Sequence, residues 1–154
     1  MKRHSYFTQA FKEASKDKGD LKKTFILLQK AYRLGDPKAA YALATWFLHG
    51  KYVKKNIRKA VSLLREASRH NVPEALFDLA VCYEAGVGIR KSDQLAMESY
   101  LRAALYGDKQ AIYEVGRCYY YGIGTNQEKR IARIWVDRAK SLERKQIRQV
   151  KAVE

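Results

Sequence analysis

The feature that most constrains the fold is a repeat of 36 residues. Shifting the sequence by 36 positions superimposes small residues on small residues and aromatic residues on aromatic ones. The aligned sets are Ala39, Ala75 and Ala111; Ala60, Ala96 and Ala132; Ala67, Ala103 and Ala139; and Gly50, Gly86 and Gly122. Phe7 and Phe11 extend the same register backwards. A period of this length is typical of solenoids, whose repeats stack on their neighbours. We therefore expect one solenoid domain over residues 1–142, with repeats at about 1–34, 35–70, 71–106 and 107–142.

Turn and cap residues divide each repeat into two helices. Gly or Asn, which tolerate a left-handed backbone, follows each predicted second helix, at Gly35, Asn71 and Gly107. Good N-cap residues precede the second helices, at Asp20, Asn56 and Ser92. Pro37 and Pro73 occupy a first helical turn, where a missing N–H costs nothing. Gly50, Gly86 and Gly122 end the first helices.

The spacing of apolar residues predicts which side of each helix is buried. Leu43, Leu79 and Val115 recur in register, and four residues later stand Phe47, Tyr83 and Tyr119. This i, i+4 spacing forms one apolar face that points into a shared core. Residues 143–154 continue the last helix as a basic extension, which we expect to cover the end of the core through Ile147 and Val150.

Residues 75–89 and 111–124 carry the pattern A-x-x-x-L-[GA]-x-x-[YF]-x-x-G, with Val115 in place of Leu in the second segment. A shorter pattern, A-x-x-[WL]-x-x-x-A, follows and places Trp135 at its aromatic position. The chain thus resembles the Sel1-like repeat family, which is related to tetratricopeptide repeats. The resemblance implies an all-α, right-handed α-solenoid of four helix–turn–helix repeats. It also implies a non-enzymatic adaptor, because members bind diverse partners and the repeat carries no catalytic residues.

Many secreted relatives have disulfides between the two helices of a repeat, but the two cysteines here do not suit one. Cys82 and Cys118 occupy equivalent positions of adjacent repeats. Equivalent helices lie roughly 8–10 Å apart, beyond the ~7 Å Cα separation that a disulfide spans. We expect two reduced thiols, as in a reducing compartment. The basic N-terminus precedes no apolar stretch, and no segment approaches the roughly 20 apolar residues of a membrane span. We expect a cytoplasmic protein that is complete at its start.

The sequence contains no recognisable catalytic or cofactor motif. Its three histidines are scattered, and none forms a metal-ligand spacing with a cysteine. The segments 86–88 and 122–124 read Gly-x-Gly, but they follow a helix and lack the Gly-Lys-Ser/Thr of a phosphate loop. We expect no catalytic residue, no metal and no cofactor, and therefore no enzyme.

The first helices carry the candidate binding residues. By analogy with related helical solenoids, these helices line the concave side. A second face, distinct from the core face, runs along each of them. It comprises Tyr41, Thr45 and Leu48; Phe77, Val81 and Glu84; and Tyr113, Arg117 and Tyr120, with Trp46 and Tyr121 at its margins. Aromatic residues and Arg dominate many protein interfaces, so this face predicts a binding groove. The alternative is that Tyr41, Phe77 and Tyr113 pack between repeats.

The net charge of +15 is unevenly distributed. Residues 1–71 and the region from Lys129 onward are basic, whereas the third repeat is mildly acidic. Surplus positive charge favours acidic partners. We expect an adaptor that binds an acidic protein or peptide in its concave groove. An immunity protein that neutralises a bacterial toxin is an alternative. Nucleic-acid binding is a less favoured one, because the acidic repeat interrupts the basic surface.

Overall fold

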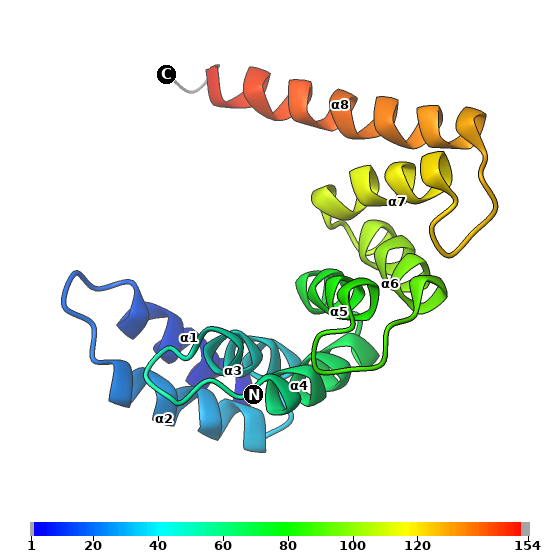
Figure 1. The fold of residues 1–154 in the computed structure, drawn as a ribbon. Coiled ribbons are helices and arrows are strands. Elements are labelled where there is room, and N and C mark those ends of the chain that lie inside the picture. Colours follow the sequence, from blue (N-terminus) through cyan, green and yellow to red (C-terminus); the bar gives the residue numbers. More distant parts are fainter. Residues whose placement is uncertain (1, 152–154) are drawn as a thin grey trace.

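The chain folds into helices that form one arc (Figure 1). The computed structural model describes the backbone of residues 2–151 and the side chains of residues 5–146 and 148. The elements are α1 (Lys2–Ala14), α2 (Leu21–Arg33), α3 (Pro37–His49), α4 (Ile57–Arg69), α5 (Pro73–Ala85), α6 (Asp93–Leu105), α7 (Lys109–Tyr121) and α8 (Lys129–Lys151). Each helix packs against the next one in the chain. The expected all-α solenoid of paired helices is confirmed.

The odd-numbered helices lie toward the opening of the arc, as α1, α5 and α7 show in Figure 1. We call the surface that they present to this opening the inner face. The even-numbered helices form the outer side, and α8 runs along one end of the arc. The expectation that the first helix of each pair lines the concave side therefore agrees with the architecture.

The predicted helix ends are confirmed. The Asp20 and Asn56 side chains each accept a hydrogen bond of 3.0 Å from the backbone N–H three residues later, and Ser92 does the same at 3.3 Å. These bonds satisfy amides that have no partner within the helix. Gly50, Gly86 and Gly122 end the first helices with φ of 70°, 69° and 71°. Local chemistry therefore sets the length of each helix.

The core follows the repeated alanine positions. Ala39, Ala75, Ala111, Ala60 and Ala96 are completely buried, and their small side chains let neighbouring backbones approach closely. Larger residues such as Leu64 and Leu76 fill the space between the helices. The first repeat departs from the pattern. Phe11 is exposed there, whereas its equivalents Phe47, Tyr83 and Tyr119 are partly buried.

The C-terminal extension is helical, since α8 has 23 residues where each of the other helices has 13. The proposed contacts of Ile147 and Val150 fall outside the described side chains. Cys82 and Cys118 are buried free thiols, as expected. Within residues 2–151, no helix is both long and apolar enough to cross a membrane.

Candidate functional site

The predicted groove residues divide into three groups by exposure. Val81, Tyr113, Tyr120 and Tyr121 are exposed to solvent. Tyr41, Thr45, Leu48, Phe77, Glu84 and Arg117 are partly buried. Trp46 is buried. The exposed residues lie on α5 and α7, so the accessible part of the predicted groove is its C-terminal half.

The placement of Trp46 at the groove margin is wrong. This side chain is only 7% exposed. Its ring stacks on Phe25 with 5.6 Å between centroids and meets Tyr52 edge-on at 6.1 Å. Trp46 stands three residues after the core residue Leu43, a spacing that puts both on the same side of a helix. The sequence therefore contained the signal for burial.

Tyr41 and Phe77 pack between adjacent repeats. The Tyr41 hydroxyl donates a hydrogen bond to the Asp78 carboxylate of the next repeat. Burial raises the pKa of both groups, and the nearby negative charge of Asp78 raises that of Tyr41 further. The Phe77 ring lies edge-on to Tyr100 of the same repeat at 5.5 Å between centroids, and it packs against a buried cluster that includes Ala111 of the next repeat. At these two positions the packing alternative holds, whereas Tyr113, at the equivalent position, is exposed.

Arg117 lies between two carboxylates. Its Nη2 donates to Glu84 at 2.7 Å and 3.0 Å, and its Nε donates to Glu114. The Tyr100 hydroxyl adds a bond of 3.1 Å to Glu84. Although partial burial of Glu84 opposes the effect, the hydrogen bonds from Arg117 and Tyr100 lower the pKa of its carboxyl group. Much of the binding capacity of Arg117 is therefore already used within the protein.

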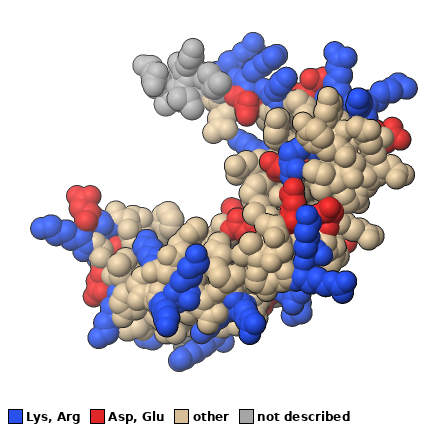
Figure 2. All heavy atoms as spheres, in the orientation of Figure 1, with Lys and Arg blue, Asp and Glu red and all other residues tan. Residues whose placement is uncertain are grey.

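Carboxylates gather on the inner face where the arc bends. Glu74, Asp78 and Asp108 are close enough for their charges to influence one another around Tyr41. Figure 2 shows acidic atoms along the hollow of the bend, whereas lysine and arginine atoms dominate the rim. At the bend, therefore, the charge of the inner face favours cationic groups over acidic ones.

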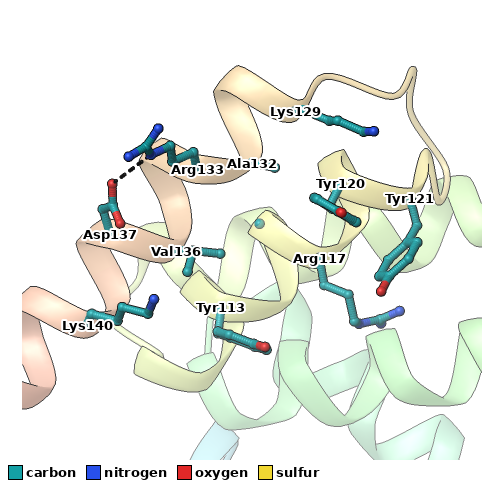
Figure 3. A pocket seen from close by; sticks show the side chains of 11 residues that line it. Tyr113, Arg117, Tyr120, Tyr121, Lys129, Ala132, Arg133, Val136, Asp137 and Lys140 are labelled. Carbon is teal, nitrogen blue, oxygen red and sulfur yellow. Dashed lines mark ion pairs between the residues drawn. The ribbon is translucent and has the colours of Figure 1, made fainter.

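A pocket of about 550 Å³ opens between α7 and α8 (Figure 3). Its walls come from Tyr113, Gly116, Arg117, Tyr120 and Tyr121 of α7 and from Lys129, Ala132, Arg133, Val136, Asp137 and Lys140 of α8. We call it the α7–α8 pocket. Tyr113, Arg117, Tyr120 and Tyr121 were predicted as groove residues. In the pocket, the exposed tyrosines lie next to four basic side chains, which are those of Arg117, Lys129, Arg133 and Lys140. The pocket is thus suited to an anionic, partly apolar group.

Sequence reasoning missed the α8 side of this pocket. The candidate binding residues were taken from the first helices alone, yet Lys129, Arg133 and Lys140 of α8 line the pocket. A usable signal lies in the repeat register. Arg133 stands where the two preceding repeats have the buried apolar residues Val61 and Met97. A charge at a core position of the repeat marks a surface that no further helix covers in the same way.

The described side chains form no arrangement suited to metal binding. Among them, no group of three or more His, Cys, Asp and Glu residues could hold a metal ion. Burial raises the pKa of the Cys118 thiol to about 11, which keeps it protonated and unreactive at neutral pH. Burial also raises the pKa of Cys82.

The sequence matches a family model described as the Sel1 repeat. The match covers residues 15–36, 37–72, 73–108 and 109–143. The last three segments correspond to the pairs α3–α4, α5–α6 and α7–α8, whereas the first contains α2 without α1. No curated protein matches the sequence.

Several solved structures resemble the fold. A Sel1 repeat protein from Oxalobacter formigenes is 29% identical with a TM-score of 0.77; the alignment covers 89% of this chain and 40% of that one. A protective antigen of uropathogenic Escherichia coli, described as displaying an SLR fold, is 21% identical with a TM-score of 0.85, over 91% of this chain and 30% of that one. An immunity protein from Pseudomonas aeruginosa is 24% identical with a TM-score of 0.64, over 91% and 53%. The chain therefore spans less than half the length of the first two.

Proposed function

Because the chain belongs to the Sel1 repeat family, we propose that it is a non-enzymatic scaffold that binds a partner protein on its inner face. The observation that carries this proposal is the group of exposed tyrosines on α7. Tyr113 is 53% exposed and Tyr121 is 67% exposed. Tyr120 is also exposed, and its ring meets that of Tyr121 edge-on at 4.8 Å between centroids. Exposed tyrosines that gather on one surface are typical of binding sites, because each offers a large apolar area and a polar hydroxyl.

The partner that fits this surface is an acidic segment held at the C-terminal end of the inner face. The basic side chains of the α7–α8 pocket support this choice, whereas Asp78 and Glu84 oppose an acidic stretch at the bend. The predicted acidic partner is thus confined to one end of the groove. The two buried free thiols support a reducing, cytoplasmic location.

The test is capture of the partner from host lysate with the tagged chain, at physiological salt and after nuclease treatment. The informative variant is Tyr113→Ala, and its matched control is Tyr106→Ala. Both tyrosines are 53% exposed, but Tyr106 caps α6 and lies outside the α7–α8 pocket. We expect a stoichiometric protein partner that Tyr113→Ala weakens and Tyr106→Ala retains. Equal retention by both variants would refute the inner-face site, and loss of all captured material on nuclease treatment would favour nucleic-acid binding.

Inhibition of a toxin is a second candidate function. Two proteins from Pseudomonas aeruginosa that are described as immunity proteins share this fold, each over at least 90% of the present chain. At 21–24% identity this similarity concerns the fold alone, so the captured partner decides between the two functions. A partner enzyme that loses activity on binding would support inhibition, and a partner with unchanged activity would support scaffolding.

A further inference from the structure

The α7–α8 pocket exists because α8 differs from its counterparts at the positions that bury a following helix. On α4 and α6 these positions hold Val61 and Met97, which are 3% and 6% exposed. The equivalent residue of α8 is the exposed Arg133. Seven residues further along each helix, the buried Ser68 and partly buried Ala104 correspond to the exposed Lys140.

Burying such charges against another helix would cost several kcal/mol per ion. A repeat of the usual kind therefore does not suit this surface. The substitutions have replaced a helix-packing surface by a polar pocket that solvent reaches.

The charges of the pocket are unequally matched. Four cations line it, but Arg117 is already paired with Glu84 and Glu114. Lys129, Arg133 and Lys140 remain, and Asp137 is the one carboxylate among the lining residues. Arg133 and Asp137 are 3.9 Å apart and both are largely exposed, so their attraction is weak. Within the described residues, neither Lys129 nor Lys140 has a carboxylate oxygen within 4.0 Å. Lys129 instead lies 5.6 Å from the centre of the Tyr120 ring. The ammonium groups of Lys129 and Lys140 therefore remain available to an anion, next to tyrosine hydroxyl groups that can donate hydrogen bonds.

We propose, on the basis of the scaffold function above, that the α7–α8 pocket is a selective subsite for glutamate or aspartate side chains of a partner peptide. Lys129, Arg133 and Lys140 supply the charge, and the tyrosines supply hydrogen bonds and apolar contact. A polyanion with continuous phosphates suits the site less well. Glu84 and Glu114 flank Arg117 immediately beside the pocket, and the carboxylates of the bend follow. A peptide can place its acidic residues in the pocket and other residues near the carboxylates of the bend. A nucleic-acid backbone cannot do this, because its phosphates are continuous.

The test measures binding of a fluorescein-labelled octapeptide of alternating glutamate and tyrosine to the full chain, by fluorescence anisotropy at 150 mM salt. The charge-reversal variant is Arg133→Glu/Lys140→Glu. The matched control is Arg130→Glu/Arg138→Glu, which makes the same change in net charge on exposed residues of the same helix outside the pocket. All four residues are exposed, so both variants should keep the wild-type circular dichroism spectrum. A lysine–tyrosine octapeptide and a single-stranded oligodeoxythymidine serve as competing probes.

We expect the pocket variant to weaken glutamate-peptide binding about tenfold or more, since each reversal exchanges attraction for repulsion. The control variant should change it by less than about threefold. An equal loss of peptide affinity in both variants would mean that only net charge matters and would overturn the proposal. Absence of peptide binding, or stronger binding of the oligonucleotide, would overturn it as well. These failures differ from failure of the scaffold function, which would show as loss of captured partner protein. A chain that still captures a partner through Tyr113 but ignores the glutamate peptide retains the scaffold role and loses only the subsite.

Discussion

The ion-pair network around Arg117 allows a quantitative test of how the inner face is held together. The change is Arg117→Met, which keeps most of the aliphatic stem and removes the guanidinium group. It abolishes the hydrogen bonds to Glu84 at 2.7 Å and 3.0 Å and the bond to Glu114. The two carboxylates, which are only 27% and 23% exposed, then lie near each other without a counter-charge.

The expected cost lies between two limits. Fully exposed ion pairs contribute about 0.2–1 kcal/mol, and hydrogen bonds to charged groups in protected sites contribute about 1.5–3 kcal/mol. For a quarter-exposed network we expect Arg117→Met to lower the free energy of unfolding by about 1.5–2.5 kcal/mol. In a double-mutant cycle with Glu84→Gln, the coupling energy should be about 1 kcal/mol. The control is Arg133→Met, whose ion pair at 3.9 Å is largely exposed and whose effect should stay within about 0.5 kcal/mol.

The assay is urea denaturation followed by far-ultraviolet circular dichroism between pH 3 and pH 8. Folding lowers the pKa of Glu84, so its contribution is fully present above the unfolded pKa of about 4.3 and is lost as pH falls through the folded pKa. The stability difference between wild type and Arg117→Met should therefore be constant at neutral pH and shrink below about pH 4. A coupling energy below about 0.3 kcal/mol, or a difference that does not depend on pH, would refute this account of the network.

Three further predictions concern the scaffold itself. Gly124→Ala should lower the free energy of unfolding by about 2–4 kcal/mol, because the glycine has φ of +64° and an added Cβ would collide with the backbone carbonyl of Asp93. At Gly35, with φ of +78°, an added Cβ would meet open space, so Gly35→Ala should lower the free energy of unfolding by only about 1 kcal/mol. Similar urea midpoints for the two variants would show that no collision occurs at Gly124. Leu76→Ala should cost about 2–5 kcal/mol by the same measurement, because the side chain is completely buried and its removal leaves a cavity; a cost below about 1 kcal/mol would show that the helices close the space. Cys118 should react with maleimide far more slowly than free cysteine at pH 7, since burial raises its pKa to about 11; equal rates in the folded and urea-unfolded protein would disprove this protection.

The structure decided which of the predicted groove residues remain available to a partner. Tyr41, Phe77 and Tyr113 are equivalent in the repeat, and the sequence assigned them one role. In the fold, Asp78 of the next repeat accepts a hydrogen bond from Tyr41, and Tyr100 of α6 in the same repeat packs on Phe77, so both side chains are partly buried. Tyr113 has α8 beside it, but the smaller Val136 stands there at the position equivalent to Tyr100, and residues 2–151 contain no helix beyond α8. Equivalent positions therefore have different environments, which depend on the neighbouring repeat.

The sequence by itself determined the helices, their ends and the stacking order. These features follow from local rules that repeat every 36 residues: a capping side chain at Asn56, a left-handed glycine at Gly86, and buried alanines such as Ala75. The tertiary structure alone decided that Arg117 is held between two carboxylates, that the bend of the inner face is acidic, and that second-helix residues of α8 complete the pocket. The physical reason is that charge and exposure depend on distances between residues some 30 positions apart, which the periodicity of a single helix does not specify.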